Sequence, residues 1–346
     1  MRYLAGVALA LASTAACVGC GGPLRADTNA GGAEAPKSIV ESTETARPDT
    51  KAVPDVVPRA DVAKALRAGA REASQSGVRI YAAVSSDQWP AAAQVDGETQ
   101  LRMWSTAKAV TAVAALRAAD GTQSGPTSDL NESIQGALER SENCRQRNVV
   151  LWLQQMVGGP AEASSAIRAE LETAGASDET IPEVPAVVPA DCVEFMGTSG
   201  VSDQLGPALQ LGTATWTPVT GSRFAWALAD GQLGQPGDKV FSIMRRPKKS
   251  SREASDPGGY TADLDWGAGK AMANLQPAYK AGWGGTEQGD FIAGQIVSLR
   301  TATGPYGVFV FGSPEKQPAL DDPGVTAIPA AVEAVLRRLA PVLGSE

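Results

Sequence analysis

The segments of this chain that read as β-strands lie near its two ends, and a long helical stretch separates them. Residues 78–85 form a strand with a weaker hairpin partner at 91–96, and strands return only at 278–283, 292–300 and 308–311. A two-stranded hairpin is marginally stable alone, so these distant segments must pair with one another. The sequence therefore predicts an α/β (α+β) fold with one antiparallel sheet built from both chain ends.

Helical periodicity flanks and interrupts this sheet. A helix is expected at 61–76, before the first strand, and another at 327–339, after the last one. The helical lobe between them spans about residues 105–230, and its expected helices cover 105–116, 129–139, 148–156, 161–174 and a segment opening at Thr217. Three loops are expected: a long ordered one at 175–211, a solvated one at 245–265, and a hairpin loop at Gly304–Gly307.

The N-terminus resembles a bacterial lipoprotein signal. An apolar stretch, residues 4–16, is too short to span a bilayer. We interpret residues 1–19 as a signal peptide, Cys20 as the lipidated residue, and 20–57 as a disordered tether rich in Gly, Ala, Pro and charge. Cleavage before Cys17 and plain secretion are the alternatives. The resemblance implies a protein held at the outer face of a bacterial cell membrane by a lipid anchor.

Composition excludes several kinds of site. The chain has no histidine, so it cannot form a Ser-His-Asp triad, a Cys-His pair or a histidine-bearing zinc site. A net charge of -8 argues against a nucleic-acid backbone as partner. Nothing in the sequence indicates a metal or an organic cofactor. A nucleophilic serine in this chain therefore needs a lysine or a carboxylate as its base.

Ser105 and Lys108 form the pattern Ser-x-x-Lys at the start of the apolar helix expected at 105–116. Residues three apart share a helix face, so the hydroxyl and the amine point the same way. Burial of the helix disfavours the charged amine, which can then accept the proton of the serine. The alternative is that Ser105 caps the helix. The same pattern recurs at Ser313, where the following proline signals a turn, and is set aside.

Two further elements carry polar groups that suit the same chemistry. Ser141 and Asn143 stand between two expected helices, where the hydroxyl can relay a proton and the amide can bind a substrate carbonyl. Lys280, Gly282 and Trp283 lie on an expected strand. The lysine supplies positive charge, the glycine permits close approach of a substrate, and the next N–H can donate to an oxyanion. Taken singly, the first element is a helix-capping loop and the second a strand with a solvated lysine.

The order Ser-x-x-Lys, Ser-x-Asn and Lys-x-Gly, each in its expected setting, is much rarer than any one of these elements. With it, residues 58–345 resemble the class A β-lactamase and penicillin-binding serine hydrolase superfamily, and residues 141–160 resemble that family's run from its second motif into Gly-Gly-Pro. The resemblance implies one β-lactamase/transpeptidase-like domain over 58–346. It implies Ser105 as nucleophile, Lys108 as base, Ser141 as proton relay, Asn143 and Lys280 as substrate-binding groups, and the N–H groups of Ser105 and Trp283 as the oxyanion hole.

Three departures from the family pattern bear on activity. Ala281 stands where the family has Thr or Ser, which removes a hydroxyl that holds the substrate carboxylate. The loop has no convincing version of the family's Glu-x-x-Leu-Asn motif, since Glu183 and Glu194 lack the right neighbours. The segment between Ser105 and Ser141 is shorter than usual. Slow hydrolysis of an acyl-enzyme would follow, which favours a penicillin-binding or esterase-like enzyme over an efficient β-lactamase.

Cys144, beside the second motif, and Cys192, in the irregular loop, are expected to form a disulfide in an oxidising compartment. Cleavage before Cys20 leaves these two as an even pair, whereas cleavage before Cys17 strands an odd thiol. Two buried thiols are the alternative to the disulfide. Closing a loop of about 50 residues would contribute about 4 kcal/mol in the chain-entropy model.

Three functions remain open at this point. The first is a monomeric, surface-tethered Ser-Lys hydrolase that acts through an acyl-enzyme on a β-lactam, a peptidoglycan-type peptide or an ester. The second is a non-catalytic module that keeps the cleft to bind cell-wall fragments or a protein. The third, a structural envelope lipoprotein, does not explain the three ordered motifs. Five polar residues at one cleft favour the enzyme, and the departures favour the binding module.

Overall fold

A five-stranded antiparallel sheet joins the two ends of the chain. The computed structural model describes residues 56–89, 91–122, 125–176, 214–247, 266–285, 291–316 and 323–344. The strands of the sheet are β1 (Val78–Ser85), β2 (Ala93–Val95), β5 (Ala278–Gly285), β6 (Phe291–Thr301) and β7 (Gly304–Pro314), in the order β2-β1-β7-β6-β5. Because β1 pairs with β7 from Val78↔Pro314 to Ser85↔Gly307, the predicted sheet of both chain ends is confirmed.

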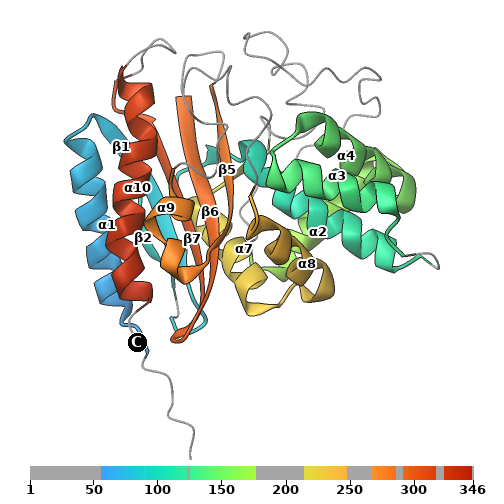
Figure 1. Ribbon diagram of the computed structural model, residues 1–346, viewed down its shortest axis with the longest axis horizontal. Coiled ribbons are helices and arrows are strands. Elements are labelled where there is room, and N and C mark those ends of the chain that lie inside the picture. Colours follow the sequence, from blue (N-terminus) through green and yellow to red (C-terminus); the bar gives the residue numbers. More distant parts are fainter. Residues whose placement is uncertain are drawn as a thin grey trace, which may run out of the picture. The chain divides into compact units, whose positions relative to one another are not determined.

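Two helices from opposite chain ends cover one face of this sheet. Helices α1 (Arg59–Ser74) and α10 (Pro323–Leu343) lie side by side against it (Figure 1). They approach closely at Gly69, where a Cβ atom would stand 2.7 Å from the Cα of Val335. The apolar cluster beneath them contains Val62, Leu66 and Val335 together with side chains of β1, β6 and β7. Helix α7 (Pro218–Asp230) covers the opposite face. Thr217 caps this helix, because its hydroxyl oxygen accepts from the Thr220 N–H. The helix that the sequence predicts to open at Thr217 is therefore confirmed.

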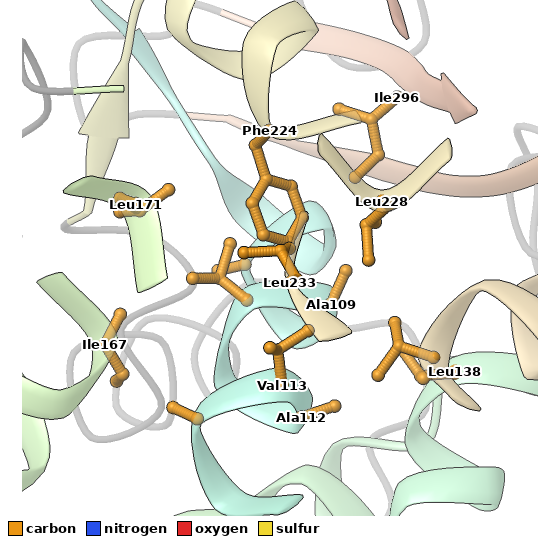
Figure 2. Close-up of a cluster of buried hydrophobic side chains, with 14 of the residues drawn as sticks. Ala109, Ala112, Val113, Leu138, Ile167, Leu171, Phe224, Leu228, Leu233 and Ile296 are labelled. Atoms are coloured by element: carbon orange, nitrogen blue, oxygen red, sulfur yellow. The ribbon is translucent and has the colours of Figure 1, made fainter. Parts of the chain in front are cut away.

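The helical lobe is built around α2 (Ala107–Asp120), which is buried on nearly every side. An Ala/Val-rich helix with apolar residues all round suits the centre of a core rather than its surface. Around it lie α3 (Ser128–Glu139), α4 (Asn143–Val157), α5 (Pro160–Thr173) and α8 (Gly234–Met244). Figure 2 shows Ala109, Ala112 and Val113 of α2 among Leu138, Ile167, Leu171, Phe224 and Leu233 from these neighbours and α7. Gly158, at φ 99°, ends α4, and Pro160 begins α5.

Short elements complete the described chain. β3 (Leu101–Arg102) pairs with β4 (Thr215–Trp216), and the 3-10 turn η1 (Trp104–Thr106) follows β3. Helix α9 (Ala268–Ala271) and the 3-10 turn η3 (Ala273–Leu275) precede β5.

Three expectations about these elements were wrong. Ser105 lies in η1 and not in the first turn of α2, because Trp104 takes φ 46° and breaks the helical path. Helix α4 begins at Asn143, five residues earlier than expected. The hairpin turn between β6 and β7 lies at residues 302–303, since Thr301 pairs with Gly304 and β7 already starts there. The proline at 305 is tolerated because it stands near the start of the strand.

Helix α8 was missed altogether. Its sequence begins Gly-Gln-Pro-Gly, which reads as a turn in a region that the sequence gives no helical period. Pro236 lies in the first helical turn, where its missing N–H costs no hydrogen bond. Leu233, Val240 and Phe241 then bury the helix in the core of the lobe.

Several sequence predictions fall on residues outside the described ranges. These are the signal peptide, Cys17, Cys20 and the tether; most of the loop at 175–211 with Glu183, Glu194 and Cys192; and most of the run at 245–265. Within the ranges that the structure describes, no helix combines the length and the apolar character needed to cross a bilayer.

Candidate active site

Lys108 connects two of the three predicted motifs. Its side chain is fully buried on α2, and its amine donates to the Ser141 carbonyl oxygen at 2.6 Å and to Asn143 Oδ1 at 2.8 Å. The Ser141 hydroxyl oxygen lies 3.3 Å from the same nitrogen. Buried amines need hydrogen-bond partners, and this one finds three oxygens on a segment more than thirty residues away. The structure therefore brings together Lys108, Ser141 and Asn143, as the sequence predicts.

The arrangement of these oxygens bears on proton transfer. The carbonyl oxygens of Ser141 and Asn143 can only accept, so they take two N–H bonds of the Lys108 amine. The Ser141 hydroxyl can accept from an ammonium or donate to a neutral amine. At its contact with the Ser141 hydroxyl, the Lys108 amine can therefore either donate a proton or accept one, as an acid–base relay requires.

Ser105 stands in η1, in the turn before α2, and its side chain is half-buried. The helix-capping alternative for Ser105 is not observed, because Thr106 is the N-cap residue of α2 and no side chain caps either η1 or α2. The residue before it, Trp104, holds a left-handed backbone at φ 46° that a bulky side chain rarely adopts. Direct contact between the Ser105 hydroxyl and the Lys108 amine stays a prediction.

Strand β5 packs its backbone against η1. A Cβ atom at Gly282 would lie 3.0 Å from the Met103 carbonyl oxygen and 3.1 Å from the Thr106 nitrogen. A Cβ at Gly284 would lie 2.4 Å from the Trp104 ring. Only glycine permits this approach, and it brings the backbone at positions 282–284 beside the backbone that carries Ser105. The close neighbour at Gly282 is thus η1; approach of a substrate there stays a prediction.

The structure tests one of the two interpretations of Lys280, and its substrate-binding role stays a prediction. Its side chain is fully buried, which contradicts the solvated-lysine alternative. Its amine donates to the Ala281 carbonyl oxygen at 2.9 Å. Lys280 pairs with Ile296, whose side chain belongs to the core of the helical lobe, so the lysine points to that side of β5. Its charge lies beneath the strand and not on the protein surface.

Ala281 and Trp283 point to the opposite side of β5, because successive side chains of a strand alternate. Ala281 is buried in the apolar cluster that faces α1 and α10. The Trp283 side chain is 37% exposed, and its ring lies 6.1 Å from that of Phe291. At position 281, where the family has a hydroxyl-bearing side chain, this chain has an alanine whose methyl group is buried in the core.

The second motif lies in a constrained segment between α3 and α4. Ser141 takes φ 56°, another left-handed backbone at a residue with a side chain. Glu142 is the N-cap residue of α4 without a side-chain cap bond, so the helix-capping alternative is not observed here either. Arg140 donates to Glu142 at 2.6 Å and holds the turn. This hydrogen bond raises the pKa of the Arg140 guanidinium.

Cys144 is the second residue of α4 and is disulfide-bonded. Each of the other three cysteines lies outside the described ranges, so the pairing with Cys192 stays a prediction. Among the described residues, no group of His, Cys, Asp and Glu could hold a metal ion.

Sequence reasoning missed Trp104 and Gly284, which fix the distance between η1 and β5. The available signals were a tryptophan directly before the serine and glycines at alternate positions of one strand face. The role of Trp104 and Gly284 depends on which element packs against β5, and the local sequence carries no information about that. Two surface depressions, of about 550 and 370 Å³, lie at the ends of α1 and α10 and beside α8, and neither includes a predicted site residue.

No family model matches the sequence, and no curated protein matches it. Solved structures do match. A β-lactamase from Streptosporangium roseum is 16% identical with a TM-score of 0.51, covering 82% of this chain and 100% of that chain. A class A β-lactamase from Bacteroides cellulosilyticus is 14% identical with a TM-score of 0.54, covering 83% and 99%. A β-lactamase from Xanthomonas campestris is 18% identical with a TM-score of 0.51, covering 82% and 99%.

At these identities the likeness concerns the fold. The predicted β-lactamase-like architecture, with a mixed helix-and-sheet part and a helical lobe, is confirmed. The substrates of those proteins are not transferred by the likeness, because unrelated activities share folds.

Proposed function

From the fold of the class A β-lactamases and the geometry around Lys108, we propose that this chain is a serine hydrolase that forms an acyl-enzyme on Ser105. The observation that carries the proposal is the fully buried Lys108 amine, hydrogen-bonded to Ser141 and Asn143 one helical turn beyond Ser105. A core position filled by an amine and three oxygens costs stability relative to an apolar core, which favours a role in chemistry over packing.

The proposed reaction begins with proton transfer from the Ser105 hydroxyl to Lys108. The Ser105 oxygen attacks the carbonyl carbon of the substrate, and the oxyanion accepts from the N–H groups of Ser105 and Trp283. Ser141 passes the proton from Lys108 to the leaving group, whose bond to the carbonyl breaks. Water then adds to the acyl-serine and releases the acid. Lys280, which is fully buried on β5, favours the developing negative charge through its own positive charge.

Asn143 has two roles in this proposal. Its Oδ1 accepts from Lys108, which orients the amide, and its Nδ2 is then directed away to bind a substrate carbonyl. The substrate class is an activated ester, a β-lactam or a peptidoglycan-type peptide.

A non-catalytic binding module is the second candidate, and one observation favours it. The only side chain that β5 exposes well beside the site is that of Trp283, while Lys280 and Ala281 are buried. A module of this kind would bind cell-wall fragments without forming a covalent bond.

Incubation of the protein with a labelled penicillin, an activated ester and a fluorophosphonate separates the two candidates. Intact mass should show a single adduct, which maps to Ser105 and is lost in Ser105→Ala. No adduct from any of the three reagents would exclude the hydrolase and leave the binding module.

We also propose that the protein is tethered to the outer face of a bacterial membrane through a lipid on Cys20, acting as a monomer on a small-molecule or peptidoglycan-derived substrate. The apolar stretch at 4–16 followed by two cysteines supports the anchor. A net charge of -8 supports a role without nucleic acid.

A further inference from the structure

We infer that the outer side of α1 is a docking surface for an anionic lipid bilayer, formed by a basic stripe of Lys64, Arg67 and Arg71. The inference rests on the proposed membrane tether for its setting and is independent of the chemistry proposed at Ser105. It adds how the folded part of the chain lies on the membrane: through α1 and α10, with the predicted active site directed away from the lipid.

The basic stripe follows from the helical spacing of α1. Lys64, Arg67 and Arg71 stand at positions i, i+3 and i+7, so they share one side of the helix over about 10 Å. All three are exposed, whereas Leu66 and Ala73 are buried on the opposite side. In the part of the chain that the structure describes, none of the three cations takes part in an ion pair. Their charge is therefore directed to the solvent.

The charge of this layer contrasts with that of the whole chain. Together α1 and α10 carry six cations against three carboxylates, although the chain has a net charge of -8. Glu72 is paired within the layer, 3.0 Å from Arg338. Glu333 is paired there with Arg337. At an ionic strength of 0.1 M the Debye length is about 10 Å, so a bilayer beneath α1 meets the charge of this layer and little of the acidic charge elsewhere.

The depression of about 550 Å³ beside the stripe adds apolar surface. It lies between the start of α1 and the end of α10, and the cations Lys64 and Arg338 and the carboxylate Asp61 line it. Apolar side chains line the rest, among them Val56 and Pro341. Val56 is 57% exposed, more than any other large apolar side chain in the described ranges. Cations around apolar groups suit the bilayer interface, where phosphates lie above acyl chains.

The proposed tether joins the fold at this depression. Val56 precedes α1 by three positions, and the proposed lipidated Cys20 lies about 35 residues earlier. A flexible tether of that length, as the sequence predicts, has an r.m.s. span of ~35 Å and keeps this side of the fold near the bilayer. The anchor then strengthens weak binding of the face by raising its effective concentration at the lipid. This position favours a bilayer over a soluble polyanion as the partner.

The predicted active site lies on the other side of the sheet. Ala281 of β5 points into the apolar cluster that α1 and α10 cover, whereas Gly282 and Gly284 pack against η1. Figure 1 shows α1 and α10 on the left of the sheet and the helices α2, α3 and α4 on the right. A bilayer beneath α1 therefore leaves η1, with Ser105, on the side away from the lipid.

Vesicle co-sedimentation tests the inference on the chain from Gly21. This chain omits the apolar stretch at 4–16, which can itself enter a bilayer, and keeps all the described helices and strands with both apolar cores. In about 50 mM NaCl it should bind vesicles with about 30% phosphatidylglycerol at least about tenfold more tightly than vesicles of phosphatidylcholine alone. About 0.5 M NaCl should remove most of the difference, because salt screens exposed charges.

A triple variant with Lys64→Gln, Arg67→Gln and Arg71→Gln tests the stripe itself. Each cation near an anionic bilayer contributes about fivefold to binding, so the variant should bind phosphatidylglycerol vesicles about 100-fold more weakly. Binding to neutral vesicles should not change. Glutamine favours a helix about as well as lysine and arginine do, so α1 should stay folded.

The matched control combines Arg168→Gln, Arg245→Gln and Arg246→Gln. It removes the same charge from α5 and from the end of α8, both in the helical lobe. This control should keep the binding, because its changes lie outside the layer of α1 and α10. An equal loss of binding in the two triple variants would assign the effect to net charge and overturn the inference.

Acetylation of lysines by a water-soluble reagent, followed by mass spectrometry, tests the orientation. When about 80% of the protein is bound to phosphatidylglycerol vesicles, modification of Lys64 should slow about fivefold, because only the free protein reacts there. Modification of Lys239, on α8, should keep its rate. Equal protection of Lys64 and Lys239 would overturn the proposed orientation.

Two further outcomes overturn the inference. One is equal binding to anionic and neutral vesicles. The other is binding to soluble polyphosphate without binding to vesicles, which would assign the stripe to a soluble polyanion. Neither outcome bears on the lipid at Cys20 or on acylation of Ser105, because detergent partitioning and adduct formation test those proposals separately.

Discussion

At the scale of single residues, the site depends on one buried amine and the oxygens around it. Lys108 is part of a core helix, yet its hydrogen bonds reach the segment between α3 and α4. Its side chain thus joins α2, the helix that follows the proposed nucleophile Ser105, to the second motif. Lys280 shows that burial of a lysine does not by itself indicate this role, since its amine bonds to the next residue of its own strand.

Lys108→Met should slow acylation of Ser105 strongly while the protein stays folded. Methionine has a similar length but no proton to exchange, so the rate should fall by about 10²–10⁴-fold. The rate of nitrophenolate release in the first turnover measures the effect. Lys64→Met replaces an exposed lysine on α1 and should leave that rate unchanged. A fall of less than threefold in Lys108→Met would remove this lysine from the mechanism.

Tyr306 predicts how stability responds to alkaline pH. Burial raises the pKa of its hydroxyl above the ordinary value of 10.0, while hydrogen bonds to Thr303 and Gln88 act against the shift. The folded state therefore holds this proton more tightly than the unfolded state. Its contribution to the free energy of unfolding is complete below pH 10 and is lost as the pH rises through the raised pKa. Urea unfolding between pH 8 and pH 11 should show a smaller decline in Tyr306→Phe; an equal decline would assign the alkaline loss to other groups.

At the scale of elements, the contact between η1 and β5 sets the distance between the turn that carries Ser105, the proposed nucleophile, and the strand that carries Trp283. The glycines at 282 and 284 allow the strand to lie against the turn, and the strained backbone of Trp104 directs its ring onto Gly284. Ser105 stands on η1, and the expected oxyanion donor Trp283 stands on β5. The packing of β5 against η1 therefore sets the distance between them. A change of about 1 Å at such a contact can cost about 10²-fold in rate.

Gly284→Ala should push η1 and β5 apart. The added methyl would stand 2.4 Å from the Trp104 ring, so one element must shift. The free energy of unfolding should fall by about 1–3 kcal/mol, and the acylation rate should fall with it. Chemical denaturation and first-turnover kinetics measure the two effects. Gly121→Ala, where the nearest heavy atom to the added carbon is 3.5 Å away, should change stability by less than about 0.5 kcal/mol. Wild-type kinetics in Gly284→Ala would show that the contact does not position the site.

At the scale of the whole molecule, three distant stretches of chain meet at one site. They are η1 with α2, the turn between α3 and α4, and β5 at the edge of the described sheet. The two apolar cores, one under α1 and α10 and one around α2, hold these stretches in place from both sides.

Peptide mapping without reductant should identify the partner of Cys144. We expect a cross-linked peptide that joins it to Cys192, since cleavage before Cys20 leaves these two cysteines and the new N-terminal one, which carries the lipid. Reduction should then lower the free energy of unfolding by up to about 4 kcal/mol, because the unfolded chain regains a loop of about 50 residues. A cross-link from Cys144 to any other cysteine would refute the predicted pairing.

Detergent partitioning of the full chain, produced in a bacterium with its own signal, should place the protein in the detergent phase. Cys20→Ala should move it to the aqueous phase or leave it unprocessed, while Cys17→Ala should have no effect. The reverse result would assign the lipid to Cys17. A protein that stays aqueous in both variants and in the wild type would be plainly secreted.

The sequence by itself determined the architecture and the set of polar residues. Strand-like segments at 78–85 and 292–300 and helical spacing between them were sufficient to predict the sheet of both chain ends, because a lone hairpin is marginally stable and distant strands must then pair. The order of three short motifs was sufficient to select Lys108, Ser141 and Asn143, which the structure brings together.

Only the tertiary structure decided how these residues stand. It placed Ser105 in a 3-10 turn, buried Lys280 beneath its strand, and directed Gly284 to the Trp104 ring. Each of these depends on a contact between segments far apart in sequence, and a contact of this kind leaves no local pattern. Helix α8 was missed for the same reason, since core packing of Leu233 and Phe241 outweighs the turn signals at its start.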